Sequence, residues 1–237
     1  MIMQTDYKSK YFSILGDSIS TLAGYNPQGY EVFYKWDKML QAGIFEAKDT
    51  WWGKVIDELG GKLLINDAFS GSLVCKHPES EIESHGCSDL RTSHLGSGDI
   101  LPDVIMIFLG INDWGWGMCV ESNDAEEDLS VFSIAYDIMI KKVKKNYPNA
   151  DIWCMTLPRS FCSGMPAFSP PERFTGGSFE EYCKAIQNIA RLNNVKLIDI
   201  YKPDSPYDTI DGYHPTRQGM MTIAGDVLAA ITNEDCK

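Results

Sequence analysis

The chain contains five short runs of mostly apolar residues, separated by longer segments with a helical repeat. Apolar runs without alternation are typical of strands in a parallel sheet that is covered on both faces. We expect strands over Tyr11–Leu15, Lys62–Asn66, Val104–Leu109, Asp151–Leu157 and Val195–Ile200.

Helical periodicity fills most of the remaining chain. We expect helices over residues 51–59, 129–143, 178–191 and 217–231, the second of them with the acidic stretch 121–128 at its start. Strands and helices that alternate predict an α/β fold, a three-layer α/β/α sandwich around a flavodoxin-like, mostly parallel five-stranded sheet. No internal repeat or compositional break divides residues 1–237, so we expect a single domain.

Two connections are unusually long for a compact domain. Residues 19–50 are rich in aromatic side chains, and residues 158–177 are rich in proline and glycine. Loops of this kind form either lids and binding loops or plain surface packing, and the sequence does not decide between these roles.

An excess of acidic side chains restricts the partners of this chain. Its 33 acidic and 21 basic residues give a formal net charge of −12. Such a surface repels phosphate backbones and anionic lipids, so we expect neither a nucleic-acid nor a membrane partner. A neutral small molecule or a sugar would experience no such repulsion.

Cysteine usage and the first residues indicate a reducing compartment. The seven cysteines are odd in number and scattered, which does not suit a disulfide framework. The segment MIMQTDYKSK has no apolar stretch long enough for a signal peptide, and no apolar run approaches the ~18 residues of a membrane span. We expect a cytoplasmic protein, although a chain trimmed of its leader would look the same.

Polar side chains follow the expected strands. In an open parallel sheet, ligands bind beyond the carboxyl ends of the strands. The segments found there are Gly16-Asp17-Ser18-Ile19, Ser70-Gly71-Ser72, Gly110-Ile111-Asn112-Asp113 and Asp211-Gly212-Tyr213-His214. One edge of the sheet therefore collects a serine, a glycine turn, an asparagine, an aspartate and a histidine.

These residues are the components of a serine acyl-transfer site. A serine hydroxyl is a weak nucleophile until a base takes its proton. His214 could take the Ser18 proton while Asp211 holds the other ring nitrogen. The oxyanion that develops needs fixed donors, which the backbone N–H groups of Ser18 and Gly71 and the amide of Asn112 could supply.

The four segments resemble the blocks of the SGNH, or GDSL-type, hydrolases. They occur in the family order between residues 11 and 215 and depart visibly only at Ile19, where the family has leucine. The resemblance implies a three-layer α/β/α carboxylic ester hydrolase without metal or cofactor. It implies Ser18 as nucleophile, His214 as base and Asp211 as its orienter. It also implies an oxyanion hole formed by the three donors named above.

The substrate is less narrowly indicated. The family spans lipases, arylesterases, thioesterases and carbohydrate deacetylases, and Thr50-Trp51-Trp52-Gly53 with Ser70-Gly71-Ser72 resembles a bacterial subgroup often linked to carbohydrate esters. We predict a serine esterase of small acyl esters, with an acetylated carbohydrate as the leading substrate. Acyl transfer to another alcohol, thioesterase activity and lipase activity are alternatives, and acyl length and oligomeric state are left open.

Further residues near the expected site have two interpretations each. Trp114 and Trp116 follow Asn112 and could stack on a sugar or aryl group, or could pack beneath the edge of the sheet. Arg91 could face the cleft as a substrate-binding residue, or could form a surface salt bridge.

Metal-ligand residue types gather at Cys75, His77, His85 and Cys87. Their spacing within each pair is tighter than in ordinary zinc sites, so no metal is expected.

A non-catalytic binding module is the main rival class. In this alternative, the turn at Ser18–Thr21 would hold a phosphate in a flavodoxin-like domain, because hydroxyls and N–H groups at a helix start bind anions. A lectin-like descendant without catalysis is a second rival. Neither class explains the asparagine, aspartate and histidine at the other strand ends.

Overall fold

A parallel five-stranded sheet forms the centre of the computed structural model, which describes residues 6–77, 84–121, 127–163, 171 and 173–234. The strand order is β2-β1-β3-β4-β8, and every neighbouring pair is parallel. The strands are β1 (Tyr11–Gly16), β2 (Lys62–Ala68), β3 (Val104–Phe108), β4 (Asp151–Met155) and β8 (Lys196–Ile198). This order confirms the predicted fold class.

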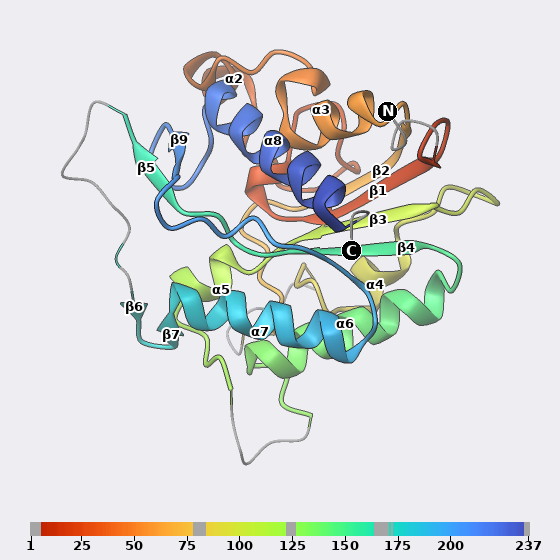
Figure 1. The fold of residues 1–237 in the computed structure, drawn as a ribbon, viewed down its shortest axis with the longest axis vertical. Helices are drawn as coiled ribbons and strands as arrows, with labels where there is room; N and C mark the ends of the chain where they lie inside the picture. The colour runs from red at the N-terminus through yellow and green to blue at the C-terminus, as the bar shows by residue number, and fades with distance from the viewer. Residues whose placement is uncertain (1–5, 78–83, 122–126, 164–170, 172, 235–237) are drawn as a thin grey trace.

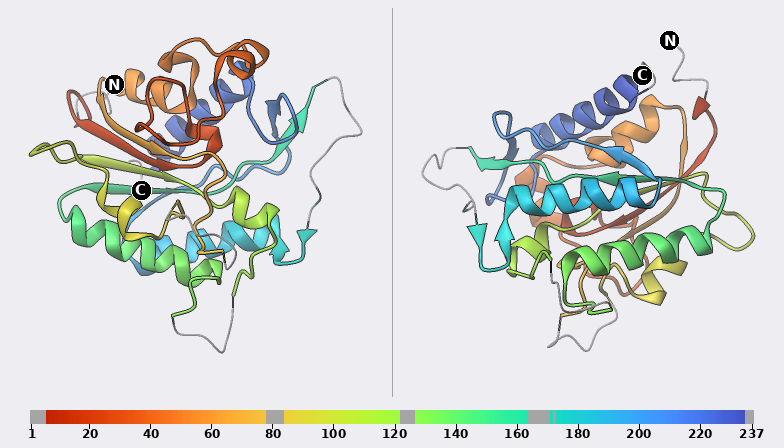
Figure 2. Two further views of the ribbon diagram at one scale, coloured as in Figure 1. Left: turned by 180° about the vertical axis from the view of Figure 1, so that it is seen from behind. Right: turned by 60° about the horizontal axis from the view of Figure 1, so that its bottom comes forward.

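Helices cover both faces of the sheet and complete three layers (Figure 1). On one face, α3 (Trp51–Glu58) packs against α8 (Arg217–Glu234), with α2 (Trp36–Ala42) on the same side. On the other face lie α4 (Asp89–Ser93), α6 (Phe132–Asn146) and α7 (Phe179–Leu192), as the two views of Figure 2 also show. Because both faces are covered, all five residues of β3 are buried, which explains its continuous apolar run.

The first three strands of the sheet end at the same level. Gly16, the last residue of β1, pairs with Ala68 of β2 and with Phe108 of β3. The segments that follow these strands therefore start side by side at one edge of the sheet.

Several short elements were not predicted from the sequence. They are α2, α4, α5 (Ile111–Gly115), β5 (Ser160–Cys162), β6 (Arg173–Phe174), β7 (Gly177–Ser178), β9 (Tyr207–Thr209) and the 3-10 turns η1 (Ser18–Ser20) and η2 (Ala47–Asp49). Elements of two to seven residues span two helical turns at most, too little for a period to be visible. The long connection 158–177 includes β5, which pairs in parallel with β9.

Several further expectations can be compared with the described residues, and one of them lies mostly outside this part of the chain. The helix expected from residue 129 begins at Phe132, and most of the acidic stretch expected at its start, residues 122–126, lies outside the described part. Within that part, no helix is both long and apolar enough to cross a membrane. The cysteines described there are free thiols.

Candidate active site

Ser18 begins the 3-10 turn that directly follows β1. The Asp17 side chain accepts a hydrogen bond from the backbone N–H two residues further on, at 3.0 Å, and so caps this turn. At its end, the Ser20 carbonyl accepts from Trp52 Nε1 and from Asn66 Nδ2, each at 2.9 Å. These bonds attach the end of the turn to α3 and β2. On the other side of the turn, Ser18 lines a cavity of about 240 Å³, the cavity above Ser18.

The other hydroxyls of this turn are used inside the protein. Ser20 Oγ accepts from Trp51 Nε1 at 3.1 Å, and Thr21 Oγ1 donates to the Ser18 carbonyl at 2.8 Å. Both side chains are fully buried. They are not available to hold a phosphate, so the structure does not favour the flavodoxin-like binding module.

His214 connects Ser18 with Asp211. Its Nε2 lies 2.9 Å from Ser18 Oγ, and its Nδ1 lies 2.8 Å from Asp211 Oδ2. Burial opposes ionisation of Asp211, but its hydrogen bonds and its attraction to a protonated His214 ring outweigh burial and hold the pKa of the carboxyl below its ordinary value. An ionised carboxylate only accepts hydrogen bonds, so Nδ1 carries a proton, and in the neutral ring Nε2 accepts from Ser18.

The spacing of three residues between the aspartate and the histidine closes a tight turn. Asp211 Oδ1 accepts from the backbone N–H groups of His214 and Tyr213, at 2.8 and 3.1 Å. Gly212 between them has φ = +96°, a conformation that residues with a Cβ rarely adopt. One carboxylate thus holds both the backbone and the ring of the histidine.

Asn112 and the glycine turn after β2 meet beside Ser18. Asn112 lies in the first turn of α5 and lines the same cavity as Ser18 and His214. Its Nδ2 donates to the Ser72 carbonyl at 2.9 Å, which joins α5 to the turn that contains Gly71. Gly71 has φ = +82° and does not itself line the cavity.

Asp113 has a role that the sequence did not reveal. This buried carboxylate accepts from the backbone N–H groups of Val74 and Cys75, both at 2.9 Å. Burial raises the pKa of Asp113, and these N–H donors partly offset the rise. The only available signal was a charged residue directly after Asn112, and that position does not identify a distant backbone partner.

The two tryptophans after Asn112 have different environments. Trp114 is 1% exposed and packs edge-on against Phe174 and Phe179. Trp116 is 64% exposed and lines the cavity above Ser18. The structure therefore favours packing for Trp114 and leaves Trp116 as the ring that a ligand could reach.

Arg91 is buried rather than placed at the surface or in the cavity above Ser18. Its guanidinium forms an ion pair with Asp67, donates to Ser72 Oγ at 2.8 Å and donates to the Gly16 carbonyl at 2.9 Å. The salt bridge that the sequence allowed is thus present but fully buried. Arg91 ties the ends of β1 and β2 to the turn after β2, and substrate contact at this position is not supported.

The residues with metal-ligand character do not converge. His85 Nδ1 lies 3.2 Å from Cys87 Sγ, whereas His77 packs edge-on against Trp116. Burial raises the pKa of the Cys87 thiol to about 12, so the side chain is a neutral thiol in this environment. In the part of the chain that the structure describes, no three such side chains form a group that could hold a metal ion.

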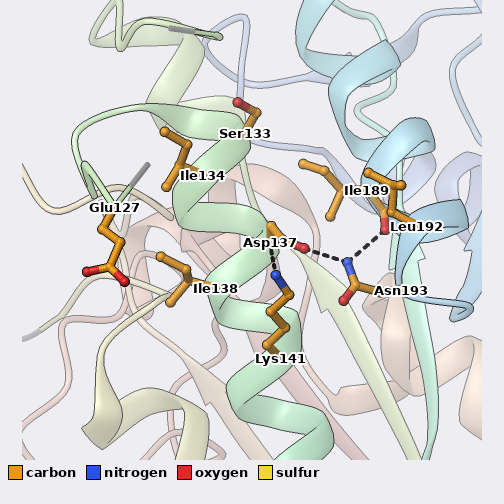
Figure 3. A pocket seen from close by; sticks show the side chains of 9 residues that line it. All are labelled: Glu127, Ser133, Ile134, Asp137, Ile138, Lys141, Ile189, Leu192 and Asn193. Atoms are coloured by element: carbon orange, nitrogen blue, oxygen red, sulfur yellow. Dashed lines mark hydrogen bonds and ion pairs between the residues drawn. The ribbon is translucent and has the colours of Figure 1, made fainter. Parts of the chain in front are cut away.

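A wider cavity of about 650 Å³ lies between α6 and α7 (Figure 3). Ile134, Ile138 and Leu192 supply its apolar surface. Its polar groups bind one another, because Asp137 accepts from Asn193 at 2.7 Å and from Lys141 at 2.6 Å. None of its lining residues belongs to the Ser18 cavity, so we assign it no part in the chemistry.

Comparisons with known proteins identify the family and the fold. A family model described as GDSL-like Lipase/Acylhydrolase matches residues 10–159. Among solved structures, a Bacteroides ovatus protein classed as a GDSL-like lipase has a TM-score of 0.72 and 26% identity, covering 95% of this chain and 99% of that one. A search of curated proteins found no match.

Two esterases share the fold at lower identity. The aryl esterase of M. smegmatis has a TM-score of 0.63 and 18% identity, with 96% of this chain and 99% of that chain covered. A family two carbohydrate esterase from Clostridium thermocellum, solved with cellohexaose, has a TM-score of 0.58 and 18% identity. That alignment covers 97% of this chain and 65% of the other.

Proposed function

Because this chain belongs to the GDSL-like lipase/acylhydrolase family and is a carboxylic ester hydrolase, we propose that it cleaves small acyl esters through Ser18, His214 and Asp211. The observation that carries the proposal is the pair of short contacts on the imidazole, 2.9 Å to Ser18 Oγ and 2.8 Å to Asp211 Oδ2. A serine hydroxyl bonded to a base, which is in turn bonded to an orienting carboxylate, is activated for acyl transfer.

The reaction proceeds in two acyl transfers. Ser18 Oγ attacks the carbonyl carbon of the ester while its proton passes to His214 Nε2. The intermediate then collapses, the bond to the alcohol oxygen breaks, and His214 returns the proton to the departing alcohol. Water attacks the resulting acyl-serine, gives its proton to His214, and the acid leaves as Ser18 recovers the proton.

Negative charge on the carbonyl oxygen would be stabilised by three donors. They are the backbone N–H groups of Ser18 and Gly71 and the side-chain amide of Asn112. The bond from Asn112 Nδ2 to the Ser72 carbonyl supports this role, because it holds the amide beside the glycine turn before substrate arrives.

An acetylated carbohydrate is the substrate we favour. The cavity of about 240 Å³ suits a short acyl group, and the exposed ring of Trp116 at its edge offers an apolar face to a sugar. The net charge of −12 favours a neutral substrate over an anionic one. The Clostridium thermocellum relative is a carbohydrate esterase and supports the choice by analogy of fold.

Substrate profiling tests the proposal. A panel of p-nitrophenyl esters of increasing acyl length, acetylated sugars and an acyl thioester should give the highest kcat/KM for acetyl esters of alcohols. Added alcohol acceptors should not divert the acyl group from water. Preference for long acyl chains or for the thioester would overturn the proposed substrate in favour of a lipase or a thioesterase.

Replacement of the nucleophile tests the mechanism. Ser18→Ala should reduce kcat by about 10⁴–10⁶, because His214 and Asp211 contribute to catalysis only through the nucleophile that they activate. Ser93→Ala is the matched control, since the Ser93 hydroxyl lies at the surface and, within the described part of the chain, bonds to two carbonyls of its own helix, Asp89 and Leu90. More than a tenth of the original activity in Ser18→Ala would show that another residue is the nucleophile.

A further inference from the structure

Phe33 lies flat against the imidazole of His214. The two ring centroids are 3.4 Å apart and the ring planes differ by 8°. Phe33 belongs to the connection between η1 and α2, within the aromatic-rich segment 19–50, and lies far from His214 in the sequence.

The stack supplies a constraint that the two hydrogen bonds of His214 lack. Contacts at Nδ1 and Nε2 act at the edge of the imidazole, and neither touches a face of the ring, so small movements out of the ring plane are restrained only weakly. A flat ring against one face restricts those movements. We propose that Phe33 is a positioning residue, which holds the imidazole in the plane where Nε2 points at Ser18 Oγ.

The backbone of Phe33 is itself attached to the Ser18 turn. Its N–H donates to Thr21 Oγ1 at 3.0 Å, and that hydroxyl donates to the Ser18 carbonyl at 2.8 Å. The Phe33 ring is therefore placed relative to Ser18 through only two hydrogen bonds.

The neighbouring residue holds the other side of the site. Tyr34 is fully buried, and its hydroxyl donates to the Pro215 carbonyl at 2.7 Å. Pro215 directly follows His214. Residues 33 and 34 thus bridge the turn of the nucleophile and the loop of the base, which come from opposite ends of the chain.

The Phe33 ring also contacts a cation from α2. The Lys38 ammonium lies 5.5 Å from the centroid of the Phe33 ring. This cation–π contact attaches the phenyl ring to α2, in addition to its stack on the imidazole.

The kinetic test rests on the proposed esterase function and uses three variants. Phe33→Leu removes the flat face but keeps an apolar side chain, and it should lower kcat for p-nitrophenyl acetate by about 10–100-fold with KM changed less than about 2-fold. Phe33→Tyr keeps the flat face and should restore kcat to within about 3-fold of the original. Trp36→Leu, an aromatic residue of α2 that is 89% exposed, is the matched control and should have no effect.

Two kinetic outcomes would overturn the proposal. An unchanged kcat in Phe33→Leu would show that the hydrogen bonds suffice to orient the ring. Equal losses of kcat in Phe33→Leu and Phe33→Tyr, with equal falls in melting temperature, would show that Phe33 acts only through packing.

A spectroscopic test does not depend on hydrolysis. Carbon-bound imidazole protons that lie over a phenyl face resonate at higher field than those of an unstacked ring. The four histidines of the chain allow assignment of His214 by its removal. In the Ser18→Ala background, its resonances should be shifted upfield and should lose that shift in Phe33→Leu. Failure of Ser18→Ala to abolish activity would count against the proposed function, whereas an absent upfield shift would count against the stack.

Discussion

Asp17 is a buried carboxyl group directly before the proposed nucleophile. It is 2% exposed, and burial raises its pKa from 3.8 to about 7. The N–H of Ile19 partly offsets this rise, and the nearby charge of Asp113 adds to it. Between these two pH values the folded protein binds a proton that the unfolded chain releases, so the free energy of unfolding falls as the pH rises through this window.

Asp17→Asn should remove this pH dependence. The amide oxygen can still accept from the Ile19 N–H, while the cost of a buried charge disappears. We expect the variant to match the original protein near pH 4 and to be more stable by roughly 2–4 kcal/mol at pH 8.5. Urea unfolding at both pH values measures the difference. A gap that is the same at both would show that Asp17 titrates normally in the folded state.

Asn112→Ala tests a single donor of the proposed oxyanion hole. The amide is expected to meet charge that exists only in the transition state, so kcat should fall by about 10²–10³ while KM changes little. Steady-state kinetics with p-nitrophenyl acetate separates the two constants. An increase in KM with an unchanged kcat would instead make Asn112 a substrate-binding residue.

At the scale of elements, the turn after β2 depends on side chains from elsewhere in the chain. Asn112 and Asp113 of α5 bind its backbone, and Arg91 of α4 binds the Ser72 hydroxyl. Gly71 therefore lies in a segment that is held from two directions.

Arg91→Met should weaken this arrangement and the fold with it. The substitution leaves Asp67, which is fully buried, without its guanidinium partner, and breaking a buried pair costs about 3–5 kcal/mol. Arg191→Met on the exposed side of α7 is the control, because the Arg191 side chain bonds to Asn188 alone among the described residues. Denaturant unfolding of both variants gives the comparison, and a loss below about 1 kcal/mol in Arg91→Met would argue that Asp67 has sufficient other partners.

The elements that could be predicted are those with enough residues to show a pattern. All five strands of the sheet lie in mostly apolar runs, and the four helices expected from the sequence carry a repeat. α2 has seven residues with exposed Trp36 and Leu40, so its apolar positions do not describe a buried stripe. From the sequence, the segment that forms α2 could be recognised only as part of the long connection 19–50.

The candidate site also contains features that a sequence pattern predicts and features that no pattern predicts. Residues at the ends of adjacent strands could be expected to meet, because parallel strands end at a common edge. The stack of Phe33 on His214 and the bonds of Asp113 join segments whose approach depends on how loops fold over that edge. No local pattern encodes such contacts. For the same reason, neither role considered for Arg91, substrate binding or a surface salt bridge, included its buried ion pair with Asp67.

At the scale of the whole molecule, charge should affect substrate capture. With a net charge of −12, the protein repels an anionic ester over a distance set by the ionic strength. We expect kcat/KM for a negatively charged p-nitrophenyl hemisuccinate to rise several-fold between about 10 and 300 mM salt, whereas the value for the neutral acetate stays constant. Equal responses of the two esters would indicate a salt effect on the catalytic groups instead.

The contact between Ser18 and His214 joins residues 196 positions apart. A growing chain that holds only β1 to β4 contains Ser18 but neither Asp211 nor His214, so the proposed triad is incomplete at that stage. During refolding, such distant contacts form only after the sheet has closed, because the entropy of the intervening loop must be lost first. Recovery of hydrolysis should therefore lag behind burial of Trp153 in β4, because activity requires the contact between Ser18 and His214 in addition to a packed sheet.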